Sequence, residues 1–313
     1  MFVDFIFLVL VTPATYLFWI YRRLKWSGII LPRTTTLLKK SGVFPIISHY
    51  FEPLFDNRLL LFPLDRDRYL PGIDFNKYKQ IDFLNKLCYQ KELEDLTLNQ
   101  DLNTAESFYI NNGVFEAGDA EFLYQFLRFL KPHNIIEIGS GNSTKIARLA
   151  LKKNKNESGD NYRHICIEPY EQPWLDNLNG VNVIRRRVEE CKLDWSSMLC
   201  AGDLLFIDSS HIIRPQGDVL KEYLEIFPQL QSGVFIHVHD IFTPKDYPKS
   251  WLVDDVKFWN EQYLLEALLT NTSRYEIVAA LNYLKNNYYS VLCKICPYLM
   301  MKHEPSSFYF KVI

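Results

Sequence analysis

The sequence of 313 residues lacks several features that would place it in a special class. Its six cysteines are too few and too scattered for the disulfide framework of a small secreted domain, so we expect reduced thiols in a cytosolic domain. A net charge of −2 gives no reason to expect nucleic acid as a partner. The composition, 48% hydrophobic and 23% charged, is that of a globular chain long enough for one large domain and an extension.

No acid interrupts the sequence between Asp4 and Glu52, and this stretch begins with an apolar run. Residues 1–21 are about as long as the roughly 20 residues that a helix needs to cross a bilayer. The basic residues that follow are Arg22, Arg23, Lys25, Arg33, Lys39 and Lys40. Because such residues stay on the cytoplasmic side, residues 1–25 are expected to anchor the rest of the chain at the cytoplasmic face. A helix lying flat on the membrane or packed on the domain is the open alternative, whereas a cleaved signal peptide fits poorly because the basic cluster follows the apolar run.

An apolar run that carries Glu137 ends in a turn with two glycines. Residues 135–147 read IIEIGSGNSTKIA, which predicts a strand, a turn at Gly139 and Gly141, and a helix after the turn. Glycines let the backbone approach a ligand closely, and the free N–H groups of a new helix favour a negatively charged group. The segment therefore predicts a site for a small anionic or phosphate-bearing molecule, in which Ser143 and Thr144 either bond the ligand or cap the helix.

Two further apolar runs end in polar residues. The first closes on Glu168 about 27 residues after Gly141, and the second delivers Asp208 and His211. The carboxyl ends of parallel strands meet at one edge of a sheet, where open α/β proteins bind their ligands. Glu168 should therefore lie beside the glycine turn, where it can accept hydrogen bonds from both hydroxyls of a ribose.

These segments resemble the motifs of class I S-adenosylmethionine-dependent methyltransferases, over roughly Tyr109 to the C-terminus. The resemblance implies that Glu137 meets the amino end of the methionine moiety and that the backbone at Ser140 and Gly141 meets its carboxylate. It further implies that an acceptor hydroxyl attacks the methyl group near Asp208 and His211. The residues assigned in this way to S-adenosylmethionine are Glu137, Gly139, Ser140, Gly141, Ser143, Glu168, Pro169 and Asp208.

Within this family, the chain resembles the bacterial branch that includes macrolide-sugar O-methyltransferases, because its pattern matches Asp208, His211 and Asp240. In that branch the corresponding acids hold Mg²⁺ and the histidine acts as the base. The candidate metal ligands here are Asp208, His239 and Asp240, but a hard cation prefers oxygen to the nitrogen of His239, so metal dependence stays open. A neutral His211, with an ordinary pKa near 6.5, could take the hydroxyl proton.

Alternating strand and helix patterns predict an α/β fold, doubly wound around a mostly parallel seven-stranded sheet of the Rossmann-like methyltransferase type, with an N-terminal helical extension. Residues 1–25 would form the membrane anchor, residues 26–107 a cap or lid, and residues 108–313 the S-adenosylmethionine-binding domain. Within the cap, residues 41–56 suit a lid or a packing segment equally, and residues 74–95 show helical periodicity. The expected strands are 134–138, 164–168, 181–185, 203–208, 233–239, 274–280 and 307–312, and the resemblance implies that the last one is antiparallel. Helices are expected over residues 251–269 and from residue 118 onward, the latter with acids in its first turn.

Methylation of a hydroxyl on a sugar, glycolipid or polyketide-like acceptor is the leading function, and a membrane tether would suit a lipid-linked saccharide. A nicotinamide-dependent oxidoreductase is the second possibility, because Gly139, Gly141 and Thr144 fall one residue short of the dinucleotide fingerprint, whose third glycine is missing. A non-catalytic binding protein with the same fold is the third. The acceptor and the oligomeric state are not set by the sequence.

Overall fold

The computed structural model describes residues 2–94, 96, 98, 107–159, 161–170 and 172–313, and it divides the chain into two compact units. One unit comprises residues 1–63 and 253–258, and the other comprises residues 64–252 and 259–313. The division after Pro63 differs from the expected boundary between residues 107 and 108. The last part of the expected cap, residues 99–106, lies outside the described residues.

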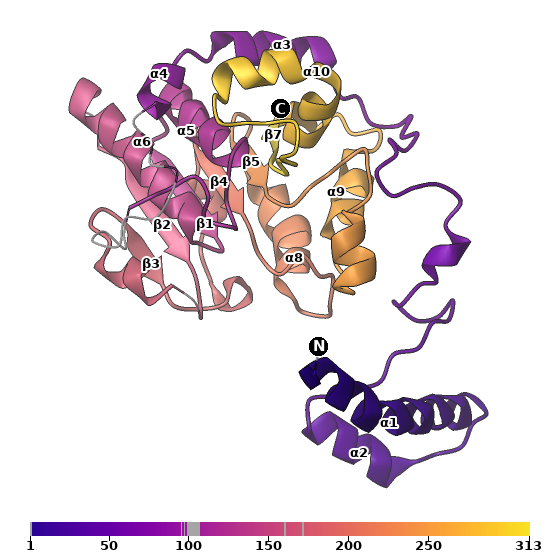
Figure 1. Cartoon of the computed structure of the whole chain (residues 1–313). Coiled ribbons are helices and arrows are strands. Elements are labelled where there is room, and N and C mark those ends of the chain that lie inside the picture. Colours follow the sequence, from indigo (N-terminus) through magenta and orange to yellow (C-terminus); the bar gives the residue numbers. More distant parts are fainter. Residues whose placement is uncertain (1, 95, 97, 99–106, 160, 171) are drawn as a thin grey trace. The chain divides into compact units, whose positions relative to one another are not determined.

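The N-terminal unit contains helices α1 (Phe2–Trp26), α2 (Pro32–Lys40) and the 3-10 turn η1 (Asn57–Leu59) (Figure 1). The Tyr21 hydroxyl lies 2.8 Å from the hydroxyl of Thr35 and joins α1 to α2. Nearly all of α1 is exposed and apolar, and it is the one helix in the described part of the chain that is long and apolar enough to cross a bilayer. The anchor and the lid stay predictions.

A seven-stranded sheet forms the centre of the larger unit, in the order β3-β2-β1-β4-β5-β7-β6. Strands β1 to β5 are parallel, and β7 runs antiparallel to both β5 and β6, which confirms the expected mostly parallel sheet. Strands β1 and β2 pair in parallel, and Glu137 lies opposite Cys166. The strands are β1 (Asn134–Ile138), β2 (Arg163–Ile167), β3 (Asn182–Ile184), β4 (Leu204–Ile207), β5 (Phe235–Val238), β6 (Tyr275–Ala280) and β7 (Phe308–Val312).

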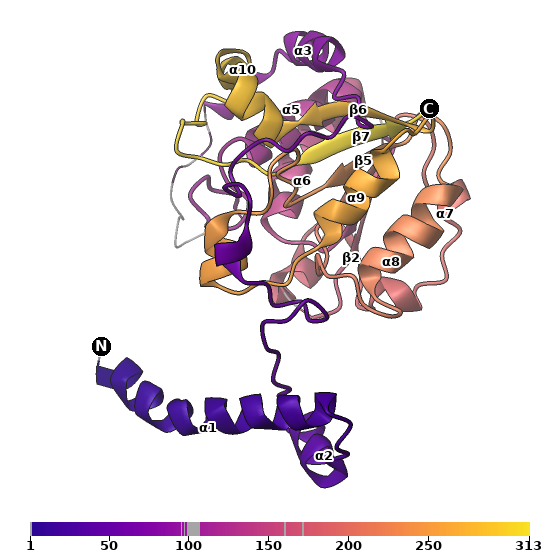
Figure 2. The same ribbon diagram turned by 90° about the vertical axis from the view of Figure 1, so that its right-hand side faces the viewer.

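Helices cover both faces of this sheet because its strands are apolar on both sides. Successive side chains on a strand point to opposite faces, so Ile136 and Leu205 enter one core while Ile135 and Leu204 enter the other. Figures 1 and 2 show the two layers on either side of the sheet. The first core takes α7 (Trp195–Met198), α8 (Asp218–Lys221) with its π-helical continuation Glu222–Ile226, and α9 (Glu261–Leu269); the second takes α5 (Asp119–Leu130), α6 (Asn142–Ser158) and α10 (Leu281–Ile295).

The helical periodicity of residues 74–95 corresponds to two helices, α3 (Lys77–Lys86) and α4 (Gln90–Leu93). Residue 95 lies outside the described residues. Helix α3 packs beside α10 (Figures 1 and 2), and the Gln80 side chain accepts a hydrogen bond of 2.8 Å from the backbone N–H of Ala280. This part of the expected cap therefore belongs to the same compact unit as the sheet.

The helix expected over residues 251–269 is wrong in its first half. A short π-helical turn spans Ser250–Asp254, and regular helix begins only at Glu261. The N–H groups of Asn260 and Glu261 donate to the carbonyl of His211 at 3.0 and 3.2 Å, and the Asn260 side chain accepts from Ile213 N–H at 2.7 Å. These hydrogen bonds interrupt the expected helix and place Glu261 next to His211.

Candidate active site

The glycine turn after β1 lies against the end of β4. A Cβ on Gly139, whose φ is +78°, would lie 1.8 Å from the carbonyl oxygen of Asp208, so only glycine fits there. Gly141 differs, because its backbone is extended and a Cβ would meet no atom within 4 Å. The hydroxyl of Ser140 is buried without a hydrogen-bond partner. Open space beside Gly141 and an unused donor at Ser140 are the features that a bound cofactor would use.

Glu137 lies beneath this turn with its carboxylate buried. One carboxylate oxygen pairs with His164 Nε2, and the other accepts hydrogen bonds from Ser143 Oγ at 3.0 Å and Thr144 Oγ1 at 2.8 Å. Its side chain is 1% exposed. In the structure Glu137 and Ser143 support the turn, and the expected contact with the cofactor, direct or through water for Glu137, stays a prediction.

The pair is charged because His164 holds a proton. Burial works against the imidazolium, but the neighbouring Cys166 and Glu137 outweigh it and raise the pKa of His164 to about 10. A protonated imidazole compensates the buried carboxylate, which would otherwise cost several kcal/mol. The Glu137–His164 ion pair thus fixes the start of α6 through the two hydroxyls.

A cavity of about 1170 Å³ opens at the carboxyl ends of β1, β2 and β4. Of the predicted site residues, Gly139, Glu168, Pro169 and Asp208 line it. Oxygens of the Glu168 carboxylate accept the backbone N–H groups of Ser140 at 3.3 Å and Tyr170 at 3.0 Å, so Glu168 lies beside the glycine turn. Charged lining residues that the sequence did not assign are Arg187, Glu189, Glu190, Arg214, Asp218, Lys221 and Glu225. The residues fit S-adenosylmethionine, and the expectation that Glu168 meets the ribose and the turn meets the methionine end stays a prediction.

His211 stands behind Asp208 among three carboxylates. Its Nε2 lies 3.2 Å from Asp208 and 3.5 Å from Asp240, and its Nδ1 lies 2.8 Å from Glu261. The ring of Trp259 packs against the imidazole at a centroid distance of 4.4 Å. The sequence predicted that Asp208 and His211 come together, and the structure adds Glu261 as the group that orients the ring.

The charges around His211 bear on its expected role. Burial favours the neutral ring, but hydrogen bonds to Asp208 and Glu261 and the charge of Asp240 raise the pKa of His211 well above its ordinary value. Burial also opposes ionisation of Asp208, yet His239 and His211 hold the pKa of that carboxyl below its usual range. These shifts favour the imidazolium form of His211, whereas the sequence predicts a neutral base, and the role of His211 in the reaction stays a prediction. Within this cluster, the Asp208 carboxylate lines the cavity.

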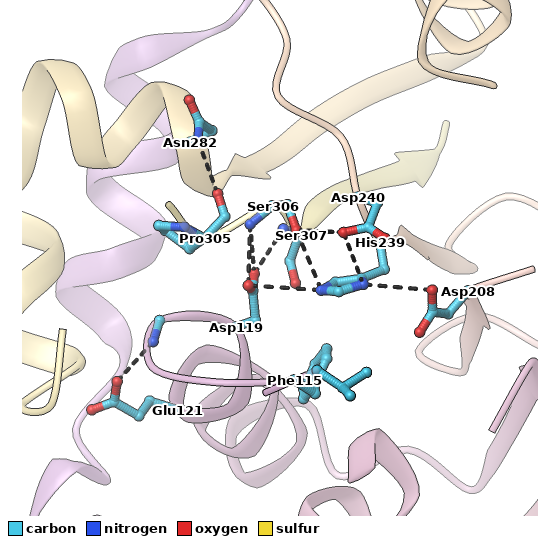
Figure 3. Close-up of polar contacts among 12 residues, drawn as sticks. Phe115, Asp119, Glu121, Asp208, His239, Asp240, Asn282, Pro305, Ser306 and Ser307 are labelled. Carbon is cyan, nitrogen blue, oxygen red and sulfur yellow. Dashed lines mark hydrogen bonds and ion pairs between the residues drawn. The ribbon is translucent and has the colours of Figure 1, made fainter. Parts of the chain in front are cut away.

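His239 completes this cluster from the end of β5 (Figure 3). Its Nδ1 lies 3.5 Å from Asp208 Oδ1 and 3.5 Å from Asp240 Oδ1, although neither contact has hydrogen-bond geometry. Burial lowers the pKa of His239, but Asp240 and Asp208 raise it well above the ordinary value. Asp208, His211 and Asp240 each offer an atom within 4.8 Å of the others, close enough to share a metal ion. Because Mg²⁺ prefers oxygen ligands, the two carboxylates suit it better than the histidine nitrogens, and the Mg²⁺ assignment stays a prediction.

The sequence did not mark two residues of this cluster as site residues. Its patterns place Glu261 inside a longer helix and Asp119 in the acidic first turn of another helix. Asp119 Oδ2 lies 3.7 Å from His239 Nε2. The only sequence signal for either was an acid at the start of a helix, which is common for capping alone.

Comparisons with known proteins agree with this arrangement. A family model described as a methyltransferase domain matches residues 136–241, from β1 to just after β5. An uncharacterized protein of Archaeoglobus fulgidus is 31% identical over 158 residues, which cover 48% of this chain and 70% of that protein.

The solved structures are less similar in sequence to this chain. A Thermobifida fusca protein described as a candidate methyltransferase has a TM-score of 0.39 and 10% identity, covering 62% of this chain and 81% of that one. CalS11, a TDP-rhamnose 3'-O-methyltransferase of calicheamicin biosynthesis, has a TM-score of 0.36 and 12% identity, covering 82% of this chain and 98% of that one. Neither likeness identifies an acceptor. From the family model, the sheet order and the cavity at its edge, the chain carries a methyltransferase domain with the class I fold.

Proposed function

We propose that this protein transfers the methyl group of S-adenosylmethionine to a hydroxyl of a sugar, glycolipid or polyketide-like acceptor. The observation that carries the proposal is Asp208: its carboxylate lies on the cavity wall, its pKa is held low, and His211 holds it from behind at 3.2 Å. An ionised acid at this edge, next to the glycine turn, suits an acceptor hydroxyl better than it suits a hydride donor.

Bound S-adenosylmethionine would supply a methyl group on a sulfonium: the acceptor oxygen attacks the methyl carbon in line, the carbon–sulfur bond breaks, and a neutral thioether leaves. Asp208 accepts a hydrogen bond from the acceptor hydroxyl and orients its oxygen, and water in the open cavity takes the hydroxyl proton as the oxygen–carbon bond forms. His211 and Glu261 keep the carboxylate in one orientation, so most of the acceleration comes from the placement of the oxygen against the methyl group.

The N-terminal unit supports a place at the cytoplasmic face of a bacterial membrane, with α1 as a single anchor. Helix α1 has the length and composition for this role, and basic residues follow its apolar part. An acceptor that is itself lipid-linked, such as a saccharide on a lipid carrier, would then reach the protein by diffusion in the membrane.

The test is incubation of the full-length protein with S-adenosylmethionine carrying an isotope-labelled methyl group, together with a pool of bacterial saccharides and glycolipids. Label should appear on acceptor oxygens with wild-type protein and fall by on the order of 100-fold with Asp208→Asn. Transfer to nitrogen or carbon alone, or equal transfer by the variant, would overturn the proposal. The same sample offered NADH with carbonyl acceptors tests the oxidoreductase alternative, and cofactor binding with no transfer would favour a non-catalytic protein.

A further inference from the structure

We propose that Asp119 is a positioning residue of the methyl-transfer site, acting through His239 on the carboxylates of Asp208 and Asp240. The inference rests on the proposed function, since it concerns the same cavity. Asp119 precedes β1 and lies outside every motif that the resemblance quotes. Its contribution is visible only in the folded chain.

The carboxylate of Asp119 is fixed from one side by backbone. Asp119 is 6% exposed at the start of α5, and its Oδ1 accepts the N–H groups of Ser306 at 3.0 Å and Ser307 at 2.7 Å. Its Oδ2 also accepts Ser306 N–H, at 3.1 Å, and is the oxygen that faces His239 (Figure 3). One oxygen thus anchors the segment before β7, and the other is directed at the imidazole.

His239 connects this carboxylate to the site. Its Nε2 lies 3.7 Å from Asp119 Oδ2, while its Nδ1 lies 3.5 Å from an oxygen of Asp208 and 3.5 Å from an oxygen of Asp240. A second route runs through Ser306, whose hydroxyl donates to Asp240 Oδ1 at 3.1 Å. The ring of Phe115 lies 5.0 Å from the imidazole and limits where the imidazole can move. Asp119, His239 and Asp208 therefore form a row of alternating carboxylate and imidazole groups that ends at the cavity wall.

Glu121 shows what a purely structural acid does in the same place. It lies two residues further along α5, is fully buried, and also connects backbone segments by accepting Gly118 N–H at 2.9 Å and Tyr298 N–H at 2.7 Å. No imidazole faces Glu121 in these contacts. Asp119 differs from it by the contact with His239, and this difference points to a role in the site.

Asp119→Asn keeps most of the backbone contacts and changes the atom that faces His239. The amide oxygen can keep the Oδ1 bonds to Ser306 and Ser307, whereas an uncharged NH₂ replaces Oδ2, which faces His239 Nε2 and also accepts Ser306 N–H. We expect kcat for methyl transfer by the full-length protein to fall on the order of 10- to 100-fold, as for other displacements of reacting groups. The KM and Kd for S-adenosylmethionine should stay within about twofold, because Glu168 and the glycine turn are untouched. Glu121→Gln is the matched control and should leave kcat unchanged.

A crystal structure of Asp119→Asn gives a readout that does not need activity. The His239 ring should turn or shift so that Nδ1 no longer lies between Asp208 and Asp240, while Ser306 and Ser307 stay in place. An unmoved ring with unchanged kcat, or an equal loss of kcat in Glu121→Gln, would overturn the inference. If wild-type protein transfers no methyl group, the proposed function fails, and the ring position still decides whether Asp119 holds His239.

Discussion

Replacing His164 with glutamine should destabilise the protein strongly and in a pH-dependent way. The change removes the cation that compensates Glu137 but leaves a polar side chain of similar reach. Both partners are at most 1% exposed, so no solvent can take over the compensation. Breaking a buried ion pair on one side costs about 3–5 kcal/mol, and we expect a loss of that size in the free energy of unfolding.

The pH dependence follows from the pKa of His164, which is raised from 6.5 to about 10 in the folded protein. A group whose pKa rises on folding stabilises the protein fully below its unfolded pKa, and this contribution disappears as the pH rises through the folded pKa. The difference between wild type and His164→Gln should therefore be largest below pH 6.5 and shrink by about 1.4 kcal/mol per pH unit towards pH 10.

Urea unfolding of the full-length protein in a mild non-ionic detergent, followed by near-ultraviolet circular dichroism at several pH values, measures this difference. His133→Gln is the control, because His133 is exposed just before β1 and its replacement should change little. A His164→Gln loss below about 1 kcal/mol at pH 6, or a loss independent of pH, would refute the charged pair.

Two further predictions concern the turn and the anchor. Gly139→Ala should lower the free energy of unfolding by about 3 kcal/mol or more, because its Cβ would meet the Asp208 carbonyl at 1.8 Å. Gly141→Ala should leave the free energy of unfolding unchanged and weaken S-adenosylmethionine binding. Equal stability losses for the two variants in a thermal melt would contradict these roles of the two glycines. Deletion of residues 2–26 should move the protein from the carbonate-resistant membrane fraction to the soluble fraction, and a soluble full-length protein would remove the anchor.

The sheet and its ligand-binding edge could be predicted because they follow from local patterns. Apolar runs marked the strands, and the rule that parallel strands present their carboxyl ends together placed Glu168 and Asp208 at one cavity. The Glu137–His164 pair was also within reach, since parallel pairing of β1 and β2 in register sets Glu137 opposite Cys166 and next to His164.

The environment of each titratable group could not be predicted from motifs. Glu261 lies 50 residues from His211 along the chain, and it reaches the imidazole only because Asn260 interrupts the expected helix. Asp119 reaches His239 through the packing of α5 against the segment before β7. These long-range carboxylates raise the pKa of both histidines, an effect that the local sequence pattern does not reveal.

Calorimetric titration of S-adenosylmethionine into wild type, Glu168→Gln and Glu168→Ala tests the central claim most directly, namely that one cofactor lies across the carboxyl ends of β1, β2 and β4. We expect saturable binding to wild type and none of NADH. Glu168→Ala, which removes both ribose acceptors, should bind at least about tenfold more weakly, and Glu168→Gln should fall between the two. Binding that is absent in wild type, or equally tight in Glu168→Ala, would contradict the account.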